Sequence, residues 1–281
     1  VVDKIVEATV KKAFNNTFQT PINEMVFGKA VVVVFILFMI YLVFSFAISI
    51  ISALIKYYGF TARREQNTLV ISYGLLEKKK FTMPVGKIKA VYNRYGFIGQ
   101  IFGLSAFHIE SIGYGDERGE IAILYPLLSE KKKHSLMAVL IPEFEFTGII
   151  VSAPKRALSS YLLVNTLLPL IIGIVLTIAV DYGYAFFGLL PLFLLHGFLS
   201  YRNNGILLDR KNIVLRKGAF TKQIVVLPTE SVQSTTQAQN FLQKRKNLFN
   251  LSFTYQSNTR GKQVGIKYMD TSIQHLYDNI Q

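Results

Sequence analysis

The chain alternates between long charge-free hydrophobic stretches and shorter hydrophobic runs that are broken by polar and basic residues. Residues 30–55 carry no charged side chain over 26 positions. An α-helix rises about 1.5 Å per residue and needs roughly 20 apolar residues to cross the hydrocarbon core of a bilayer. Residues 157–180 and 182–200 form two further charge-free stretches, which only Asp181 separates. The pattern therefore predicts three transmembrane helices, the last two joined by a short turn.

The shorter runs predict two β-rich segments, one between the first and second helices and one after the third. Polar or glycine-containing breaks separate these runs, as is typical of strands and turns. In the first segment we predict strands at residues 60–65, 69–73, 79–83, 90–93, 106–112 and 121–125, and a closing helix at 129–140. In the second we predict strands at residues 205–208, 213–217, 223–227, 252–256 and 263–268, and a closing helix at 272–280.

The two β-rich segments look like copies of one unit. A glycine follows an equivalent hydrophobic run in each copy, and a proline stands ten residues after each glycine. The landmarks of the match are Gly74 with Gly218, Pro84 with Pro228, and residues 101–105 with 248–252, where the second copy carries three extra residues. Matching landmarks indicate a repeat. A small antiparallel sheet that curls on itself and is plugged by one helix would hide its edges.

The excess of basic over acidic residues indicates that the chain lies beside an anionic surface. The chain is 51% hydrophobic and has 31 Lys and Arg against 17 Asp and Glu, a net charge of +14. These values suit an integral membrane protein with basic parts beside anionic lipid, whereas nucleic acid binding would explain the charge but not the spans. The absence of cysteine excludes disulfides and thiolate chemistry. Because the chain begins at Val1 without Met, we interpret it as a fragment of a longer protein.

The distribution of basic residues predicts an orientation. Short loops rich in Lys and Arg stay on the cytoplasmic side, and the Asp181 turn has neither. Residues 56–156 hold 15 basic and 9 acidic residues, and residues 201–281 hold 12 and 4. Basic residues also flank the two later spans, at Lys155, Arg156, Arg202, Arg210 and Lys211. We therefore expect both β-rich segments in the cytoplasm, and the N-terminal segment and Asp181 outside it.

The N-terminal segment shows helical amphipathicity over residues 2–14. It fits an interfacial helix on the outer leaflet and equally a helix packed on neighbouring protein. Asn15, Asn16 and Thr17 match a glycosylation sequon, which matters only in a glycosylating secretory pathway.

Several motifs in the first copy resemble a known family. They are YYGF at 57–60, GLLEKKK at 74–80, MPVGKIKAV at 83–91 and FGL at 102–104. This series resembles the membrane-flanked bacterial pleckstrin-homology-like domain family, of which the chain looks like a larger, multi-domain member. The second copy matches more loosely, with Asn250 in the place of Gly103 and an expanded loop before it. The resemblance implies a non-enzymatic envelope role, a smaller sibling membrane protein as partner, and a link to tolerance of membrane-active peptides.

Residue patterns and resemblance together predict an integral membrane α + β chain, in which transmembrane helices alternate with two pleckstrin-homology-like antiparallel β-barrels, each closed by a C-terminal helix. The expected order is an extracytoplasmic amphipathic segment at 1–27, a transmembrane helix at 28–57, a cytoplasmic domain at 58–150, transmembrane helices at 155–180 and 182–201, and a second cytoplasmic domain at 202–281.

The sequence offers no constellation for catalysis. The four histidines are scattered, and no paired-histidine zinc motif, phosphate-binding loop or nucleophile elbow occurs. We therefore predict no enzyme activity, no catalytic residues, no metal and no cofactor.

Three basic clusters carry the strongest indication of a binding site. They are Lys78, Lys79 and Lys80; Lys131, Lys132 and Lys133; and Lys244, Arg245 and Lys246. A basic residue close to an anionic leaflet gains about 1 kcal/mol, and the effect falls off within roughly 8 Å. Anionic lipid headgroups are thus candidate ligands, while the alternative is a solvated face that keeps the domain soluble.

Two polar residues lie inside the predicted hairpin. Asn165 stands 15 residues before Val180 and His196 stands 14 after Tyr182, so both are expected about 20 Å below the turn. We predict that both side chains point into protein and hydrogen bond to each other. A structural staple is favoured over a proton relay, because no third ionisable group is near in sequence.

Two functions remain open. The first is a membrane-anchored scaffold whose cytoplasmic domains bind a partner protein or anionic lipid. The second is a subunit of a lipid or peptide transport or export assembly, which would need polar groups at membrane depth. The spans offer few of these: Asn165, Thr166, Thr177 and His196.

Overall fold

A computed structural model describes residues 20–112, 122–257 and 261–273. The chain divides into two compact units. The first consists of residues 1–59 with 74–77, and the second of residues 60–73 with 78–281. The expected amphipathic segment over residues 2–14 and the sequon at 15–17 lie outside the described residues.

The first unit is built on one long helix, α2 (Thr20–Lys56). The expected span began at residue 28, so the helix starts eight residues earlier in the chain. Its stretch Val32–Lys56 is long and apolar enough to cross a membrane, and no part of the apolar window is buried against protein. The turn at residues 74–77 packs on the end of this helix, where the Leu75 amide donates to the Ile55 carbonyl at 3.1 Å.

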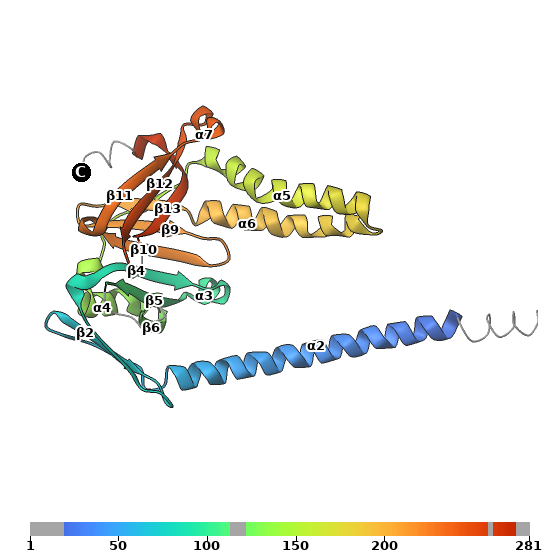
Figure 1. The fold of residues 1–281 in the computed structure, drawn as a ribbon, viewed down its shortest axis with the longest axis horizontal. Coiled ribbons are helices and arrows are strands. Elements are labelled where there is room, and N and C mark those ends of the chain that lie inside the picture. Colours follow the sequence, from blue (N-terminus) through green and yellow to red (C-terminus); the bar gives the residue numbers. More distant parts are fainter. Residues whose placement is uncertain (1–19, 113–121, 258–260, 274–281) are drawn as a thin grey trace, which may run out of the picture. The chain divides into compact units, whose positions relative to one another are not determined.

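The first copy of the repeat contributes the strands β1 to β6 and the helices α3 and α4 to the second unit, most of which are labelled in Figure 1. They are β1 (Thr61–Glu65), β2 (Thr68–Tyr73), β3 (Lys79–Pro84), β4 (Ile88–Tyr95), α3 (Phe97–Phe102), β5 (Leu104–Ser111), β6 (Ala122–Ser129) and α4 (Glu130–Leu140). Strands β1, β2 and β3 form an antiparallel sheet of their own. The closing helix predicted at 129–140 is confirmed as α4.

The second copy repeats this order with six strands and one short helix. They are β8 (Gly205–Leu208), β9 (Asn212–Lys217), β10 (Lys222–Pro228), β11 (Val232–Ala238), α7 (Phe241–Arg245), β12 (Leu248–Gln256) and β13 (Gly261–Asp270). Strands β11, β12 and β13 form a second antiparallel sheet of three. Of the closing helix expected at 272–280, the structure describes only a single turn, Thr271–Ile273, and the remainder lies outside the described residues.

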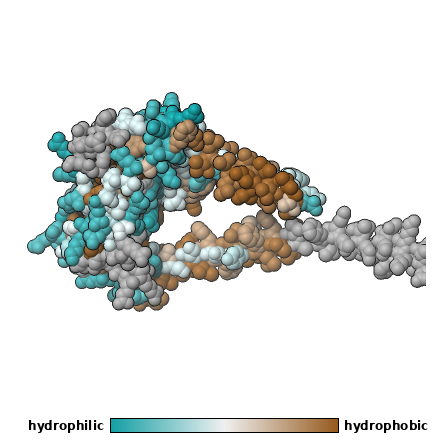
Figure 2. All heavy atoms as spheres, turned by 45° about the horizontal axis from the view of Figure 1, so that its top comes forward, coloured by the Kyte–Doolittle hydropathy of each residue, from teal (hydrophilic) through white to brown (hydrophobic). Residues whose placement is uncertain are grey.

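A helical hairpin separates the two copies. It follows a short strand, β7 (Val151–Ser152), and consists of α5 (Leu158–Ala179), a 3-10 helix η5 (Gly183–Leu189) and α6 (Leu190–Arg202). The two legs run side by side away from the strands, and their outer surface is hydrophobic along most of its length (Figures 1 and 2). Small residues allow the legs to approach, because a Cβ added at Gly197 would lie 3.1 Å from the Tyr161 carbonyl oxygen. Within the described residues, three helical segments could therefore cross a membrane.

The strands of the two copies meet in one seven-stranded sheet, whose order is β6-β5-β4-β10-β9-β8-β7. Strand β4 of the first copy pairs antiparallel with β10 of the second, with Asn93 opposite Ile224 and Val91 opposite Val226. The sheets are open, so the two closed barrels that we expected are not what the strand pairing shows. An unpaired strand edge exposes backbone hydrogen-bond donors and acceptors. Here the edge strands β4 and β10 of the two copies pair with each other and satisfy these groups.

The structure also corrects the internal alignment of the repeat. Gly74 and Gly218 adopt the same positive φ, 114° and 111°, and stand 144 residues apart, as do Pro84 and Pro228. Counting the same 144 residues from Gly103 leads to Asn247, which also has a positive φ. The carbonyls of Gly103 and Asn247 accept equivalent backbone hydrogen bonds, from Glu130 and Thr271. The match of Gly103 to Asn250, with an insertion before it, was therefore wrong; the residues before Asn247 form the helix α7.

The hairpin is attached firmly to the second copy. Tyr161, in the second turn of α5, is buried in a core with residues of β9, β10, β12 and β13. Its hydroxyl donates to the Lys267 carbonyl at 2.9 Å, and its ring packs edge-on against Tyr268 at 4.9 Å. On the other leg, the Asn204 amide donates to the same Lys267 carbonyl at 2.8 Å. Both feet of the hairpin are thus fixed to strand β13.

Candidate functional site: a basic cavity at the foot of the hairpin

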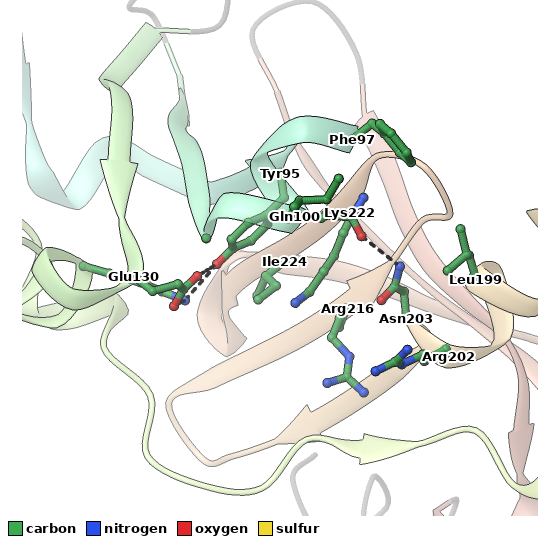
Figure 3. Close-up of a pocket in the computed structure, with 13 residues that line it drawn as sticks. Tyr95, Phe97, Gln100, Glu130, Leu199, Arg202, Asn203, Arg216, Lys222 and Ile224 are labelled. Carbon is green, nitrogen blue, oxygen red and sulfur yellow. Dashed lines mark hydrogen bonds and ion pairs between the residues drawn. The ribbon is translucent and has the colours of Figure 1, made fainter.

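A cavity of about 630 Å³ lies where the end of α6 meets α3, α4 and the strands β9 and β10 (Figure 3). Elements of both copies and of the hairpin therefore contribute to its walls. The lining residues are Tyr95, Phe97, Gln100, Ile101, Gly103, Glu130, Lys133, Leu199, Arg202, Asn203, Arg216, Lys222 and Ile224.

The cavity is strongly basic. Four cationic side chains line it, Lys133, Arg202, Arg216 and Lys222, against the single carboxylate of Glu130. Burial lowers the pKa of Lys222, and the neighbouring charges of Arg216, Lys133 and Arg202 lower it further, while Glu130 opposes them. Charges that destabilise one another in this way are relieved by an anion placed between them.

Arg216 gives this cavity a donor without a partner. One of its terminal nitrogens donates to the Ser152 hydroxyl at 2.8 Å, but its Nε is buried and makes no hydrogen bond. Burial lowers the pKa of the guanidinium. A buried donor left unpaired costs roughly 1–3 kcal/mol, so an acceptor arriving in the cavity would recover part of that cost.

Tyr95 and Glu130 organise the opposite wall. The Tyr95 hydroxyl donates to Glu130, and the Lys133 ammonium lies 3.4 Å from the same hydroxyl. The Lys222 ammonium lies over the Tyr95 ring, 4.8 Å from its centroid. The one carboxylate is therefore held by Tyr95, with the Lys133 ammonium 3.8 Å away, and Arg202, Arg216 and Lys222 face the cavity without forming ion pairs to it.

Apolar side chains also line the cavity, namely Phe97 and Ile101 from α3 and Leu199 from α6. Phe97 and Ile101 are well exposed. Gln100 and Asn203 close the wall between them, with the Asn203 amide donating to the Gln100 side chain at 3.4 Å (Figure 3). The cavity thus combines cationic with apolar side chains.

The basic clusters predicted from the sequence are not brought together. Lys133 alone reaches the cavity, while Lys131 and Lys132 are exposed on the outside of α4. Lys78 precedes β3, and Lys79 and Lys80 are its first two residues. Lys244 and Arg245 end α7, and Lys246 follows it. The prediction from the sequence did not identify the other three cations of the cavity, Arg202, Arg216 and Lys222, because each lies outside the predicted basic clusters.

The two polar residues of the hairpin lie against each other. His196 Nδ1 is 2.8 Å from Asn165 Oδ1, and the Asn165 amide also donates to the Tyr161 carbonyl at 2.7 Å. The His196 ring lies 5.7 Å from the Phe220 ring, in the turn between β9 and β10. That this pair acts as a structural staple stays a prediction.

No group of three or more potential metal-ligating side chains occurs among the described residues. The chemistry of the cavity, four cations with one engaged carboxylate, suits binding of an anion.

The comparisons with known proteins agree with the repeat and the membrane segments. The family model described as Bacterial PH domain matches the chain twice, over residues 17–146 and 138–275. A curated relative, the UPF0699 transmembrane protein YdbT of Bacillus subtilis (strain 168), is 28% identical over 236 residues, which is 83% of this chain and 48% of the relative. The chain thus spans about half the length of that relative. Because the two matches together cover nearly all of the chain, the protein belongs to the Bacterial PH domain family.

Proposed function

We propose that this chain is a membrane-anchored, non-enzymatic scaffold whose β domains face the cytoplasm and hold an anionic lipid headgroup in the basic cavity. The observation that carries the proposal is the set of Arg202, Arg216 and Lys222 around one cavity at the foot of an apolar hairpin. Arg202 is the last residue of α6, which places it where the apolar helix gives way to polar structure. Headgroup phosphates lie at that boundary.

The seven-stranded sheet supports the assignment of both copies to one side of the membrane. Strands β4 and β10 belong to different copies and are hydrogen-bonded neighbours, so a bilayer cannot pass between them. The basic residues at both feet of the hairpin favour the cytoplasmic side for this sheet. We also propose, on the family resemblance, that a smaller sibling membrane protein is a partner of this chain. The same resemblance suggests a role in tolerance of membrane-active peptides.

The alternative, a subunit of a transport or export assembly, has less support in the hairpin. The hydroxyls of Thr166 and Thr177 donate to carbonyls of their own helix, at 2.7 and 2.8 Å. Asn165 and His196 engage each other. These polar groups therefore have hydrogen-bond partners inside the hairpin. Asn165 and His196 also line a cavity of about 350 Å³, but its other walls include β13, so this cavity lies at the foot of the hairpin, whereas a substrate path needs polar groups that face a cavity at membrane depth.

The test compares two charge-matched variants of the whole chain in detergent. Arg202→Gln with Lys222→Gln removes two cavity cations, and Lys131→Gln with Lys132→Gln removes two exposed lysines from nearby α4. Short-chain phosphatidylglycerol and phosphatidylcholine are titrated, and bound lipid is counted by native mass spectrometry. We expect a preference for phosphatidylglycerol, and the cavity variant to weaken its binding about tenfold, equivalent to about 1.4 kcal/mol.

The control variant should change this affinity by less than about twofold. Inorganic phosphate is added as a competitor to distinguish a lipid site from a site for a free anion. Low concentrations of phosphate would displace the lipid from a site for a free anion but not from a lipid site. Equal losses in both variants, or equal affinity for the two lipids, would show that the cavity is not a headgroup site.

A further inference from the structure

The two short helices α3 and α7 expose an unusual amount of apolar surface. Phe97, Ile98, Ile101 and Phe102 on α3 are between 57% and 70% exposed, and Phe241 and Leu242 on α7 are 71% and 64% exposed. Each such side chain in water forgoes the burial free energy of about 25 cal/mol per Å² of apolar surface. Contiguous exposed apolar surface of this kind marks an interaction site.

The same feature occurs in both copies of the repeat. Phe97 and Phe241 are separated by the same 144 residues as Gly103 and Asn247, and each opens a short helix between equivalent strands. Two independent helices with the same apolar first turn require one explanation that serves both copies. A binding groove in one copy would explain the exposed apolar side chains of only one helix. A surface that both copies face would explain the exposed apolar side chains of both helices.

Both helices lie at the end of the second unit from which the hairpin departs (Figure 1). On the α7 side, the Lys246 ammonium donates to the Ser159 hydroxyl at 2.7 Å, and Ser159 belongs to the first turn of α5. On the α3 side, Gln100 donates to the Phe220 carbonyl at 2.6 Å and accepts from Asn203, the residue that follows α6. Each short helix is thus fixed beside one leg of the hairpin.

Ring contacts of Phe97 show how far α3 reaches along the hairpin, away from the basic end of α6. The Phe97 ring lies 6.0 Å from the Phe220 ring, which lies 5.7 Å from the His196 ring of α6. His196 stands six residues before Arg202, so it is about 9 Å further along the helix from the basic end. The turn at Phe220, and Phe97 beside it, therefore reach the level of the apolar part of the hairpin.

Basic residues flank the apolar tips. Lys244, Arg245 and Lys246 lie on or directly after α7, and Arg202 and Lys222 lie beside α3 in the cavity. Apolar side chains that enter a bilayer while neighbouring cations stay at the phosphates are typical of interfacial segments.

We propose that α3 and α7 insert their apolar side chains into the same membrane leaflet from which the α5–α6 hairpin emerges, so that each copy of the repeat is seated in the bilayer interface. The occupant of this surface is lipid, because the surface is continuous with the membrane-spanning hairpin and is bordered by cations. The two short helices thereby fix the height and tilt of the seven-stranded sheet at the membrane.

The absence of tryptophan from the chain allows a direct test. Phe97→Trp and Phe241→Trp are made singly in the whole chain, which is reconstituted into vesicles of phosphatidylcholine and phosphatidylglycerol. Val139→Trp serves as the control, because Val139 is 68% exposed at the C-terminal end of α4, six residues beyond Lys133, where the helix lines the cavity. Circular dichroism verifies that each variant is folded.

We expect blue-shifted emission at positions 97 and 241, strong quenching by lipids brominated near the headgroup end of their chains, and neither effect at position 139. Emission at 97 and 241 that resembles emission at 139 would overturn the proposal. Blue-shifted emission without quenching by brominated lipid would also overturn it, because the tips would then be covered by protein, either a second copy of this chain or a partner.

Discussion

At the scale of single residues, one buried carboxylate links the two copies. Glu110 on β5 accepts hydrogen bonds from the Tyr255 hydroxyl at 2.7 Å, the Ser257 hydroxyl and the Lys262 ammonium at 3.0 Å. Tyr255 also hydrogen bonds to Tyr92 on β4. Glu110 and Tyr92 belong to the first copy and the other three residues to the second. The polar cluster therefore helps to fix the two copies relative to each other.

The ionisation of Glu110 makes this link dependent on pH. Burial alone would raise the pKa of the carboxyl, but the hydrogen bonds from Ser257, Tyr255 and Lys262 outweigh it and lower the pKa below its usual range. A carboxyl whose pKa is lowered by folding stabilises the fold above its unfolded value of about 4.3, and loses that contribution as pH falls through the folded pKa.

We predict that Glu110→Gln destabilises the second unit at pH 7 by roughly 1–3 kcal/mol, since it removes a charged acceptor from three donors. The cost should shrink as pH falls below the unfolded value of about 4.3, and should be lost only below the lowered pKa of the folded carboxyl, where the native side chain is itself protonated. Thermal unfolding in detergent at several pH values measures both effects. Glu65→Gln is the matched control, because Glu65 pairs with Arg63 at an exposed site. A cost for Glu110→Gln that is the same at every pH would contradict this assignment.

At the scale of elements, the sequence predicted those strands whose burial alternates or is continuous. The runs around β2 and β9 are mostly buried and hydrophobic, and both were found. Strand β11 was missed because its residues, VQSTTQA, are polar and largely exposed, and it is held as a strand by pairing with β12. The pairing between β4 and β10 was not predicted, because the hydrophobic pattern of one strand does not indicate which other strand it pairs with.

The candidate site was hidden from the sequence for the same reason. A run of adjacent lysines is visible in a sequence, whereas Arg202, Arg216 and Lys222 come from α6, β9 and β10 and meet only in the folded chain. One feature, the two glycines 144 residues apart, did signal the repeat correctly, because a positive φ favours glycine at both turns.

The hairpin provides a prediction at this scale. Asn165 and His196 join α5 to α6 through one hydrogen bond, and such bonds in membranes are worth about 0.6 kcal/mol on average. If the pair is a staple, Asn165→Leu and His196→Leu should each cost little stability. The double variant should cost less than the sum of the two, because each change removes the same bond.

Thermal unfolding of the single and double variants measures this coupling, and binding of lipid by each variant shows whether function is retained. Additive losses would mean that the two side chains do not interact. Loss of function in a variant that is stable and correctly inserted would favour a proton relay instead.

At the scale of the whole molecule, the shared sheet restricts the topology. The first copy precedes the hairpin and the second follows it, and strands of both lie in one sheet. A hairpin crosses the membrane twice and returns the chain to the side from which it left, as this sheet requires. The charge bias predicts that this is the cytoplasmic side, because Lys155, Arg156 and Arg202 stand at the feet of the hairpin and no Lys or Arg stands at its tip.

A chain without cysteine makes this topology directly measurable. We predict that, in intact cells, a membrane-impermeant thiol reagent labels Asp181→Cys at the tip of the hairpin, and leaves Lys132→Cys on α4 and Ser234→Cys on β11 unlabelled. All three positions are exposed, so all three should react after the membrane is permeabilised, which controls for accessibility. Labelling at 132 and 234 but not at 181 would reverse the orientation while leaving the fold intact. Labelling at only one of 132 and 234 would contradict the fold itself, because α4 and β11 belong to two copies whose strands β4 and β10 pair in one sheet, and such a unit cannot lie on opposite sides of a bilayer. Positions 132 and 234, one in each copy, therefore test whether the two copies share one side of the membrane, and their comparison with position 181 tests the orientation that the charges predict.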